Sequence, residues 1–318
     1  MARWGVVAGI VGAGVALGFW VGPREFAPPP NLQTPPVPKL DELEDWIAAS
    51  EARHGPTPGT EKRVLWADGE VHRRTPWSVI YVHGYSATRQ ELAPVPERVA
   101  ARLGANLFET RLTGHGLPGT KLAEATADAW IRDYREAIRV GYRLGERVAL
   151  LGVSTGATID AYVSMYGVEG PDAHLWISPN FGPKSASAEL LLWPWARVWV
   201  PWVAGTERSW EPANEAQGRY WTTRYPVEAL FPMQALVQAA RSGPLAAIDG
   251  PTFVVHSSDD EVIDPKAVRT AFENIGANPK KRLELSGASD AHVLAGEILS
   301  PENTDRLVDD LTAWLATL

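Results

Sequence analysis

The segment Gly152-Val153-Ser154-Thr155-Gly156 restricts the fold of this chain more than any other part of the sequence. It follows an apolar run over residues 147–151 and precedes a stretch of helical spacing that extends through Met165. In a strand–turn–helix unit of this kind the serine stands on a sharp turn, so that its hydroxyl projects from the edge of a sheet. The N–H groups at the start of the helix then face any negative charge that develops there. The segment predicts that Ser154 is a nucleophile, with a structural glycine-rich turn as the alternative.

Short apolar runs alternate with segments of helical spacing along most of the 318 residues. The expected helices are residues 89–103 and 125–144, and the expected strands are residues 79–82, 106–110, 147–153, 175–178, 252–256 and 282–285. This alternation is typical of a mostly parallel, doubly wound α/β sheet. The chain is long enough for one such domain with an insertion, or for two small domains.

Residues 181–248 interrupt the alternation. They hold six of the 14 tryptophans and no convincing strand. Two densely apolar segments, residues 190–195 and 198–203, have Arg197 as the only charged residue between them. We therefore expect a largely helical, tryptophan-rich cap inserted between two parts of the core, residues 40–180 and 249–318.

The N-terminal residues differ in character from the rest of the chain. Residues 4–22 carry no charge, and 19 residues of helix span roughly 28 Å, about one bilayer core. Residues 1–22 are therefore expected to be an uncleaved membrane anchor with an exported, periplasmic or extracellular, catalytic body. A signal peptide whose cleavage leaves a secreted protein and a merely buried helix are the alternatives. Residues 23–39 contain seven prolines, which favour a semi-rigid spacer of up to ~50 Å.

The composition excludes several kinds of protein. The net charge of −8 and a pI of about 5.5 argue against nucleic-acid binding, which requires a basic face. The absence of cysteine excludes disulfides, thiolate nucleophiles and zinc–sulfur sites. The sequence implies no metal, nucleotide or organic cofactor, and it does not indicate an oligomeric state.

A second element of a catalytic site follows the expected strand 79–82. There the sequence His83-Gly84-Tyr85 can turn the N–H of Tyr85 toward the serine. Together with the N–H of Thr155, it would form an oxyanion hole, in which each donor contributes roughly 3–4 kcal/mol. His83 itself is expected to be structural.

A serine nucleophile requires a base and an acid that orients it. Of the seven histidines, His256 and His292 follow expected strands, and the order serine–acid–histidine along the chain favours His292. The acid must come from residues 259–264, where four carboxylates compete. Asp264 precedes a proline and is expected to cap a helix. Spacing alone does not choose among the others.

These motifs occur in an order that resembles the α/β-hydrolases of the carboxylesterase and monoacylglycerol-lipase branch. The motifs are His83-Gly84-Tyr85, Arg111 to Gly116, Gly152 to Gly156, Asp260 to Ile263 and Asp290-Ala291-His292. The resemblance covers roughly residues 61–315. It implies Asp260 as the acid, with Asp259 as runner-up, and His292 as the base. It also implies that residues 181–248 are a lid over an acyl pocket, and the substrate-contacting candidates are Gly84, His115, Trp193 and Trp199.

The resemblance implies a serine hydrolase that cleaves carboxylic esters, including acylglycerol-like lipids, through an acyl-enzyme. An acyltransferase and an amidase or peptidase use the same triad, and a membrane-tethered binding module is the non-catalytic alternative. The lid tryptophans are expected either to face the membrane or to pack on the pocket as an ordinary cap. The expected partners are an ester or lipid substrate and a membrane contacted through the N-terminal segment.

Overall fold

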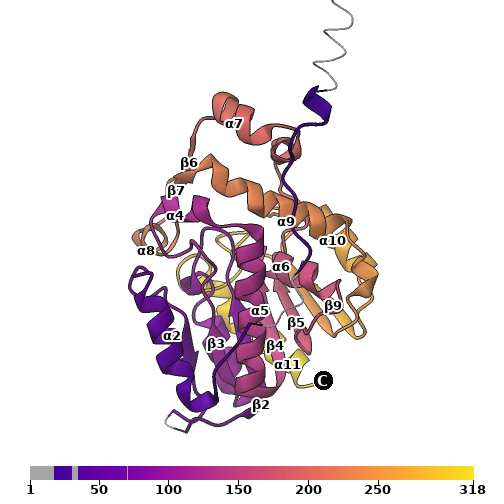
Figure 1. Cartoon of the computed structure of the whole chain (residues 1–318). Helices are drawn as coiled ribbons and strands as arrows, with labels where there is room; N and C mark the ends of the chain where they lie inside the picture. The colour runs from indigo at the N-terminus through magenta and orange to yellow at the C-terminus, as the bar shows by residue number, and fades with distance from the viewer. Residues whose placement is uncertain (1–17, 31–34, 70) are drawn as a thin grey trace, which may run out of the picture.

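The computed structural model describes residues 18–30, 35–69 and 71–318 (Figure 1). Its centre is a seven-stranded sheet of order β1-β3-β2-β4-β5-β8-β9, in which only the edge strand β1 is antiparallel to its neighbour. The strands are β1 (Arg63–Leu65), β2 (Thr75–Val82), β3 (Asn106–Glu109), β4 (Gly145–Val153), β5 (Ala173–Ile177), β8 (Thr252–His256) and β9 (Lys280–Glu284). The mostly parallel α/β sheet expected from the sequence is confirmed.

Helices cover both faces of this sheet, and alternate residues of each strand pack on opposite layers. In β2, Val79 and Tyr81 face one cluster, whereas Ile80 and Val82 face the other. The first cluster contains α3 (Val95–Leu103) and α11 (Thr304–Leu315). The second contains α2 (Leu43–Ala52), α5 (Ala127–Leu144), α6 (Thr155–Ser164) and α10 (Pro265–Asn274). Burial on both faces explains why the strands appear in the sequence as continuous apolar runs.

The parallel register brings the carboxyl ends of the central strands to one edge. Val82 of β2 pairs with Gly152 of β4, and Val153 pairs with Ile177 of β5. Ile177 in turn pairs with Val255 of β8. The loops that follow these strands therefore meet at the place where ligands bind in open α/β sheets.

Most expected elements are present, with shifted ends. The expected helix 89–103 is divided, however, into a 3₁₀ turn, η2 (Arg89–Glu91), and α3. Pro94 stands between the two parts, and proline lacks the N–H group that a continuous helix would need there. Asp264 caps α10 as expected, since its carboxylate accepts the N–H of Lys266.

The inserted segment lies over the edge of the sheet at which the strands end (Figure 1). Its elements are η3 (Ala186–Leu192), α7 (Ala196–Ala204), β6 (Glu207–Ser209), α8 (Glu215–Tyr220), β7 (Arg224–Pro226), η4 (Val227–Ala229), α9 (Leu230–Ser242) and η5 (Leu245–Ala247). The expectation of no strand here was wrong, because β6 and β7 form a small antiparallel sheet. Three residues per strand are too few to produce a recognisable alternation in the sequence.

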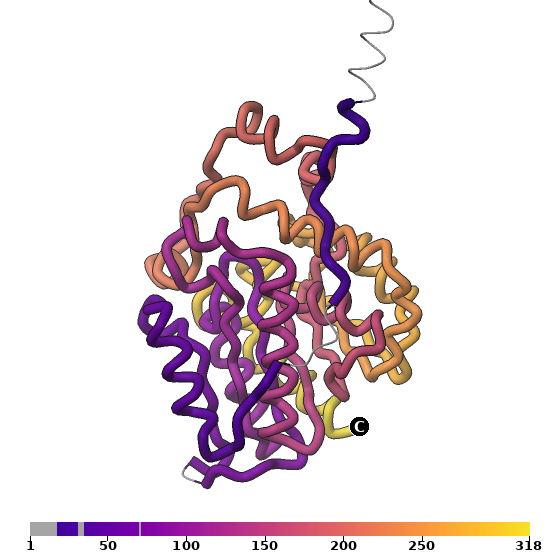
Figure 2. Tube along the Cα trace, in the orientation of Figure 1, coloured from indigo at the N-terminus to yellow at the C-terminus, as the bar shows by residue number. Residues whose placement is uncertain are grey.

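The N-terminal segment, residues 18–30, runs along the inserted segment and reaches α6 (Figure 2). The Tyr162 hydroxyl of α6 donates to the Pro28 carbonyl over 3.1 Å, and further along the chain Val37 is buried in the core. This proline-rich segment therefore contacts the protein at several points, and Pro30 is buried, whereas Pro23, Pro29 and Pro36 are exposed. Among the described residues, no helix is both long and apolar enough to cross a bilayer. Residues 1–17 of the expected anchor lie outside the described residues.

Candidate active site

Ser154 occupies the turn between β4 and α6 in a sterically restricted conformation. Its φ is +47° and its ψ is −111°, which L-residues rarely adopt. Its N–H donates to the Ile177 carbonyl over 2.9 Å, and its carbonyl accepts the N–H of Thr158 over 3.0 Å. These backbone bonds hold the strained turn, and the side chain is 5% exposed.

The two glycines of the motif are required by close approach of the backbone. A Cβ on Gly156 would lie 2.2 Å from the Val82 carbonyl oxygen, and one on Gly152 would lie 2.8 Å from the Ala157 nitrogen. Any side chain at either position would push α6 away from β2 or β4. The pattern recognised in the sequence therefore has a direct steric cause.

His292 and Asp260 are joined by a hydrogen bond. The Nδ1 of His292 lies 2.8 Å from Oδ2 of Asp260, which is fully buried. The other carboxylate oxygen, Oδ1, accepts the N–H groups of Val262 and Ile263 at 2.8 and 2.9 Å. With Asp260 ionised, Nδ1 is the donor, and Nε2 of the neutral ring remains free to accept a proton.

The backbone around His292 is also fixed. Asp290 accepts the N–H groups of His292 and Val293, each over 2.8 Å. Ser178, in the loop after β5, donates its hydroxyl to the His292 carbonyl over 2.7 Å. The imidazole is therefore held from three loops.

The surroundings of His292 raise its pKa above the ordinary value of 6.5. Burial alone would lower this pKa, but the hydrogen bond and the charge of Asp260 outweigh it. The carboxylates of Glu91 and Asp290 add to the effect. The imidazolium form that arises when a base accepts a proton is thus favoured here.

Glu91, on η2, is a buried acid that the sequence analysis did not identify. Its Oε2 accepts the N–H of Gly84 over 2.7 Å and the hydroxyl of Tyr81 over 3.3 Å. Burial raises the pKa of Glu91 to about 7, against the lowering effect of the Gly84 N–H and of His292. A glutamate eight residues after a strand-ending histidine is too ordinary in sequence to mark a site. Only the turn of the chain brings it back under the Gly84–Tyr85 loop.

A cavity of about 380 Å³ contains Ser154 and His292 in its wall. The core also contributes Thr155 and Tyr85, the two expected oxyanion-hole residues, together with Glu91 and Asp290. The inserted segment supplies the opposite wall, through Arg208, Trp210, Gln217, Trp221, Tyr225 and Met233. The cavity is thus closed by the two regions together, and one side of it is largely aromatic.

Trp193 and Trp199 do not line this cavity. Trp199 packs in a separate small cluster around Phe231, and its indole N–H donates to the Pro194 carbonyl over 3.0 Å. Trp193 is 46% exposed. The tryptophans of the insertion that line the cavity are instead Trp210 and Trp221.

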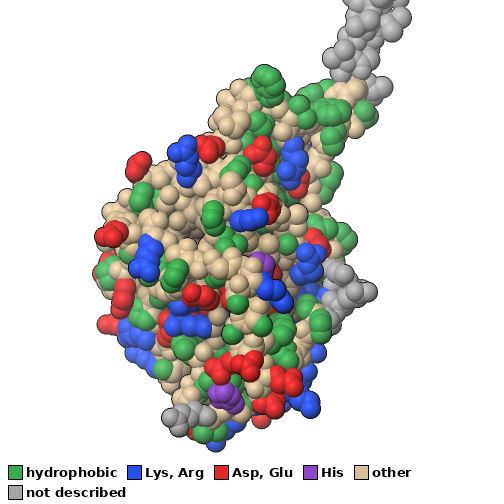
Figure 3. Space-filling view, turned by 60° about the vertical axis from the view of Figure 1, so that its left-hand side comes forward, with side chains coloured by type: hydrophobic (Ala, Val, Ile, Leu, Met, Phe, Trp, Pro, Cys, Tyr) green, Lys and Arg blue, Asp and Glu red, His purple; other side chains and the backbone are tan. Residues whose placement is uncertain are grey.

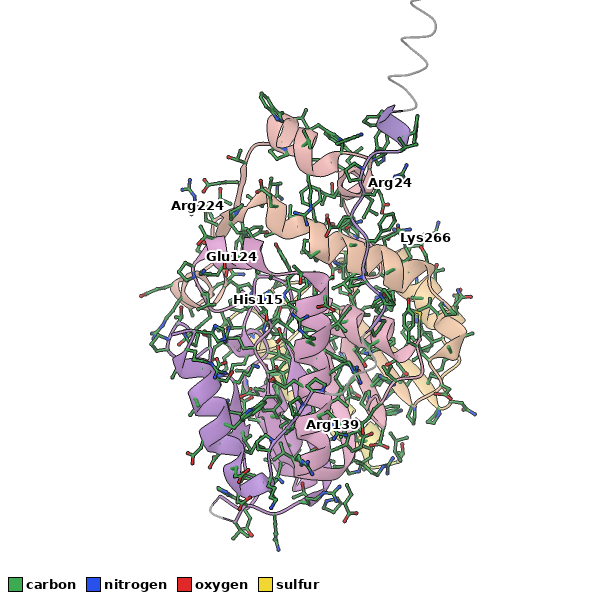
Figure 4. The ribbon with its side chains drawn as sticks, in the orientation of Figure 1. Arg24, His115, Glu124, Arg139, Arg224 and Lys266 are labelled. Atoms are coloured by element: carbon green, nitrogen blue, oxygen red, sulfur yellow. The ribbon has the colours of Figure 1, made fainter. Side chains whose placement is uncertain are left out.

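His83 and His115 are buried behind the cavity. His83 contacts the Gly84 carbonyl through Nδ1 at 2.9 Å and accepts the Leu112 N–H at Nε2 over 3.1 Å, as expected for a structural residue. Burial lowers the pKa of His83 to about 4, so it is neutral. His115 lies inside the core beside α5, with its ring against Tyr85 and Trp130 (Figure 4). It supports Tyr85 from behind, and neither it nor Gly84 lines the cavity.

The competing base and acid lie elsewhere. His256 is buried, and its Nε2 lies 2.8 Å from the Arg282 guanidinium. The side chain of Asp259 is exposed, although its neighbour Asp260 is fully buried. Neither His256 nor Asp259 lines the cavity. Across the part of the chain that the structure describes, no group of three His, Asp or Glu side chains converges as a metal site requires.

Comparison with known proteins gives one family and several similar structures. The family described as serine aminopeptidase, S33, matches residues 74–297. A structure reported for LipS and LipT, two metagenome-derived lipolytic enzymes, is 20% identical, with a TM-score of 0.69 over 83% of this chain and 100% of that one.

Two monoglyceride lipases are also similar in structure. The monoacylglycerol lipase of Paleococcus ferrophilus is 16% identical, with a TM-score of 0.60 over 80% of this chain and 98% of the other. A soluble variant of the Saccharomyces cerevisiae enzyme, in complex with a substrate analogue, is 13% identical, with a TM-score of 0.59 over 91% and 96%. At these identities the likeness establishes the fold.

Proposed function

Because this chain belongs to the serine aminopeptidase S33 family of hydrolases, which have the α/β-hydrolase fold, we propose that it cleaves carboxylic esters with Ser154 as nucleophile. The observation that carries the proposal is the His292–Asp260 hydrogen bond, placed at the cavity that also holds Ser154. Ser154 and His292 line the same cavity, Asp260 is bonded to His292, and the cavity lies at the edge of the sheet where open α/β folds bind ligands.

In the proposed reaction, the hydroxyl oxygen of Ser154 attacks the ester carbonyl carbon while Nε2 of His292 accepts the hydroxyl proton. The backbone N–H groups of Tyr85 and Thr155 stabilise the oxyanion that forms. The tetrahedral intermediate collapses, and His292 returns the proton to the leaving alcohol. Water, deprotonated by His292, then hydrolyses the acyl-enzyme and restores Ser154.

The cavity favours a lipid-like ester with a modest acyl group. Trp210, Trp221, Tyr225 and Met233 provide an apolar wall from the inserted segment, which acts as the lid of the pocket. A cavity of about 380 Å³ is within the size range of small-molecule sites. The names of the similar lipases agree with an acylglycerol-like substrate.

An aminopeptidase activity is the second candidate, because two carboxylates line the same cavity. Glu91 and Asp290 would face the free amino group of a peptide substrate. Asp290 already accepts two backbone N–H groups, however, and Glu91 is held by Gly84. Their occupation by the protein's own donors favours the ester.

The test is labelling of the full chain by a fluorophosphonate probe, with Ser154→Ala as the comparison. Short- and long-chain p-nitrophenyl esters, monoacylglycerols and aminoacyl anilides are then assayed in parallel, with and without added glycerol. We expect labelling that is lost in Ser154→Ala and turnover of esters well above that of anilides. Anilide turnover above ester turnover would assign the peptidase, and acyl transfer to glycerol that outpaces hydrolysis would assign an acyltransferase. A folded wild-type protein with no labelling and no turnover would support the non-catalytic binding module.

For localisation we propose that residues 1–22 remain attached as a membrane anchor and that the catalytic domain is exported. The support is the uncharged run over residues 4–22 and the absence of an obvious cleavage pattern after it. The intact mass of the protein isolated from membranes tests retention of the segment. A mass lower by that of the N-terminal segment would mean that the segment is a cleaved signal peptide and that the protein is secreted.

A further inference from the structure

Exposed apolar side chains gather at one end of the molecule. Of the 13 large hydrophobic side chains that are exposed among the described residues, eight belong to two segments, residues 18–26 and 193–203. The most exposed are Trp202, Phe26, Val21 and Val203, at 87%, 74%, 73% and 72%. Figure 3 shows hydrophobic side chains, in green, at this end of the molecule.

The two segments are joined by a set of contacts that we call the clamp. The backbone N–H of Trp195 donates to the Pro23 carbonyl over 2.8 Å, and its indole N–H donates to the Gly18 carbonyl over 3.2 Å. The guanidinium of Arg197 lies 2.7 Å from the Glu25 carboxylate. Residues 172 to 177 positions apart in the sequence are thus held together.

The clamp requires glycine at position 22. A Cβ on Gly22 would lie 2.0 Å from the indole nitrogen of Trp195, so the ring packs directly on the backbone. Trp195 itself has a φ of +60°, a left-handed conformation that is unusual for a bulky residue. Such a conformation persists when the surrounding contacts hold it, and here those contacts come from the N-terminal segment.

The sequence indicates what this surface contacts. The uncharged run over residues 4–22 ends within the clamp, to which Gly18 and Gly22 belong, and the first charges after it are Arg24 and Glu25. A run of this length suits a bilayer core. Tryptophans concentrate at the boundary between lipid and water, and the face of α7 that carries Trp202 would lie at that boundary.

We infer that residues 18–26 and α7 form one docking face for a phospholipid bilayer, oriented by the clamp. The apolar side chains of α7 enter the interfacial layer beside the N-terminal segment. Because α7 belongs to the lid, the catalytic cavity is then held at a constant position relative to the membrane. This inference concerns contact with lipid and does not rest on ester hydrolysis.

The absence of cysteine permits a site-specific test in the full chain. A Val203→Cys variant is labelled with an environment-sensitive fluorophore and reconstituted in phosphatidylcholine vesicles that contain a lipid-borne quencher near the headgroup. Val71→Cys, which is 49% exposed in a turn outside the docking face, is the control position. For an interfacial helix buried about 5–10 Å, we expect roughly twofold or greater quenching at position 203 and none at position 71.

Two glycine substitutions distinguish the effect of the clamp from the effect of an added methyl group in the uncharged run. Gly22→Ala places a methyl group against the Trp195 ring, whereas Gly18→Ala meets nothing within 4 Å. Both add the same methyl group to the uncharged run. We expect Gly22→Ala to reduce quenching at position 203 while the fraction of protein in the vesicle pellet is unchanged, and Gly18→Ala to leave both unchanged.

Three results would overturn the inference. Equal quenching at positions 203 and 71 would mean that α7 does not contact lipid. A label at position 203 that is already shielded without vesicles would mean that a second copy or another part of the chain covers this face. Equal behaviour of Gly22→Ala and Gly18→Ala would mean that the clamp does not orient α7.

Discussion

The loops at the carboxyl ends of the strands and the inserted lid form the two walls of one cavity, but they are constructed differently. The core wall is held by backbone hydrogen bonds and buried carboxylates, and Ser154 is 5% exposed. Half of the residues in the lid wall are aromatic (Trp210, Trp221 and Tyr225), and they lie on or beside short elements. Part of the same lid leaves Trp202 87% exposed. Under the proposed function, the core wall supplies the reacting groups and the lid wall contacts the substrate.

The residues of the core wall are held in place by several hydrogen bonds. Besides their mutual bond, the Asp260 carboxylate accepts two backbone N–H groups, and the backbone of His292 is bonded to the side chains of Asp290 and Ser178. The lid depends instead on packing and on the clamp to the N-terminal segment. Substitutions in the core should therefore change the rate of the chemical step, and those in the lid should change substrate preference or membrane contact.

The largest expected effect is that of Ser154→Ala. Loss of the nucleophile should lower ester turnover by about 10⁶-fold, the size of effect seen when a catalytic serine is removed from a triad. Ser164→Ala, at the other end of α6, is the matched control and should retain activity. Initial rates with a p-nitrophenyl ester measure both variants. Near-normal turnover by Ser154→Ala would mean that Ser154 is not the nucleophile.

Asp260→Asn should lower kcat by about 10⁴-fold, because the amide no longer favours the histidine tautomer with a free Nε2. Asp259→Asn changes the adjacent, exposed carboxylate and should leave kcat within about twofold, as surface substitutions usually do. The pair decides between the two acids that the sequence left open. A greater loss in Asp259→Asn would reverse the assignment.

Trp221→Ala tests the lid wall. Trp221 is 8% exposed and lines the cavity, so its removal should lower kcat/KM for long-chain esters by roughly tenfold and destabilise the fold by about 3 kcal/mol. Trp202→Ala removes an equally large side chain outside the cavity and should leave hydrolysis of soluble esters within about twofold. Steady-state kinetics and thermal unfolding compare the two. Equal losses would contradict the division of roles within the lid.

The smallest expected effect is a shift in pH dependence. His292 acts as a base only when neutral, so kcat/KM should fall as the pH drops through its pKa, which lies above 6.5. The Glu91 carboxylate raises this pKa. Glu91→Gln keeps an acceptor for the Gly84 N–H but removes the charge, so the acidic limb should move to lower pH. A pH profile of kcat/KM measures the shift, and an unmoved limb would show that Glu91 acts only on the loop.

Much of the core could be predicted because its signals are local. The strand before Ser154, Gly152 against Ala157 and the N-cap at Asp264 each depend on neighbours within a few residues, whereas Gly156 is required by its approach to Val82 of β2. Glu91 could not be predicted, because nothing in its local sequence distinguishes it from a surface glutamate of a helical turn. Which tryptophans of the inserted segment line the cavity could not be predicted, because Trp210 and Trp221 flank elements that include the β6–β7 pair, and this pairing has no recognisable pattern in the sequence.

The sequence by itself determined the strands and helices, their order along the chain and the serine turn, because apolar periodicity and the strand–turn–helix pattern act over short distances along the chain. Only the tertiary structure decided which carboxylate meets His292, which tryptophans line the cavity and where the proline-rich segment lies. Asp260 and His292 are 32 residues apart, and Trp195 and Gly18 are 177 apart. Contacts over such separations depend on how whole layers pack, and that information is distributed over the entire chain rather than carried by any one motif.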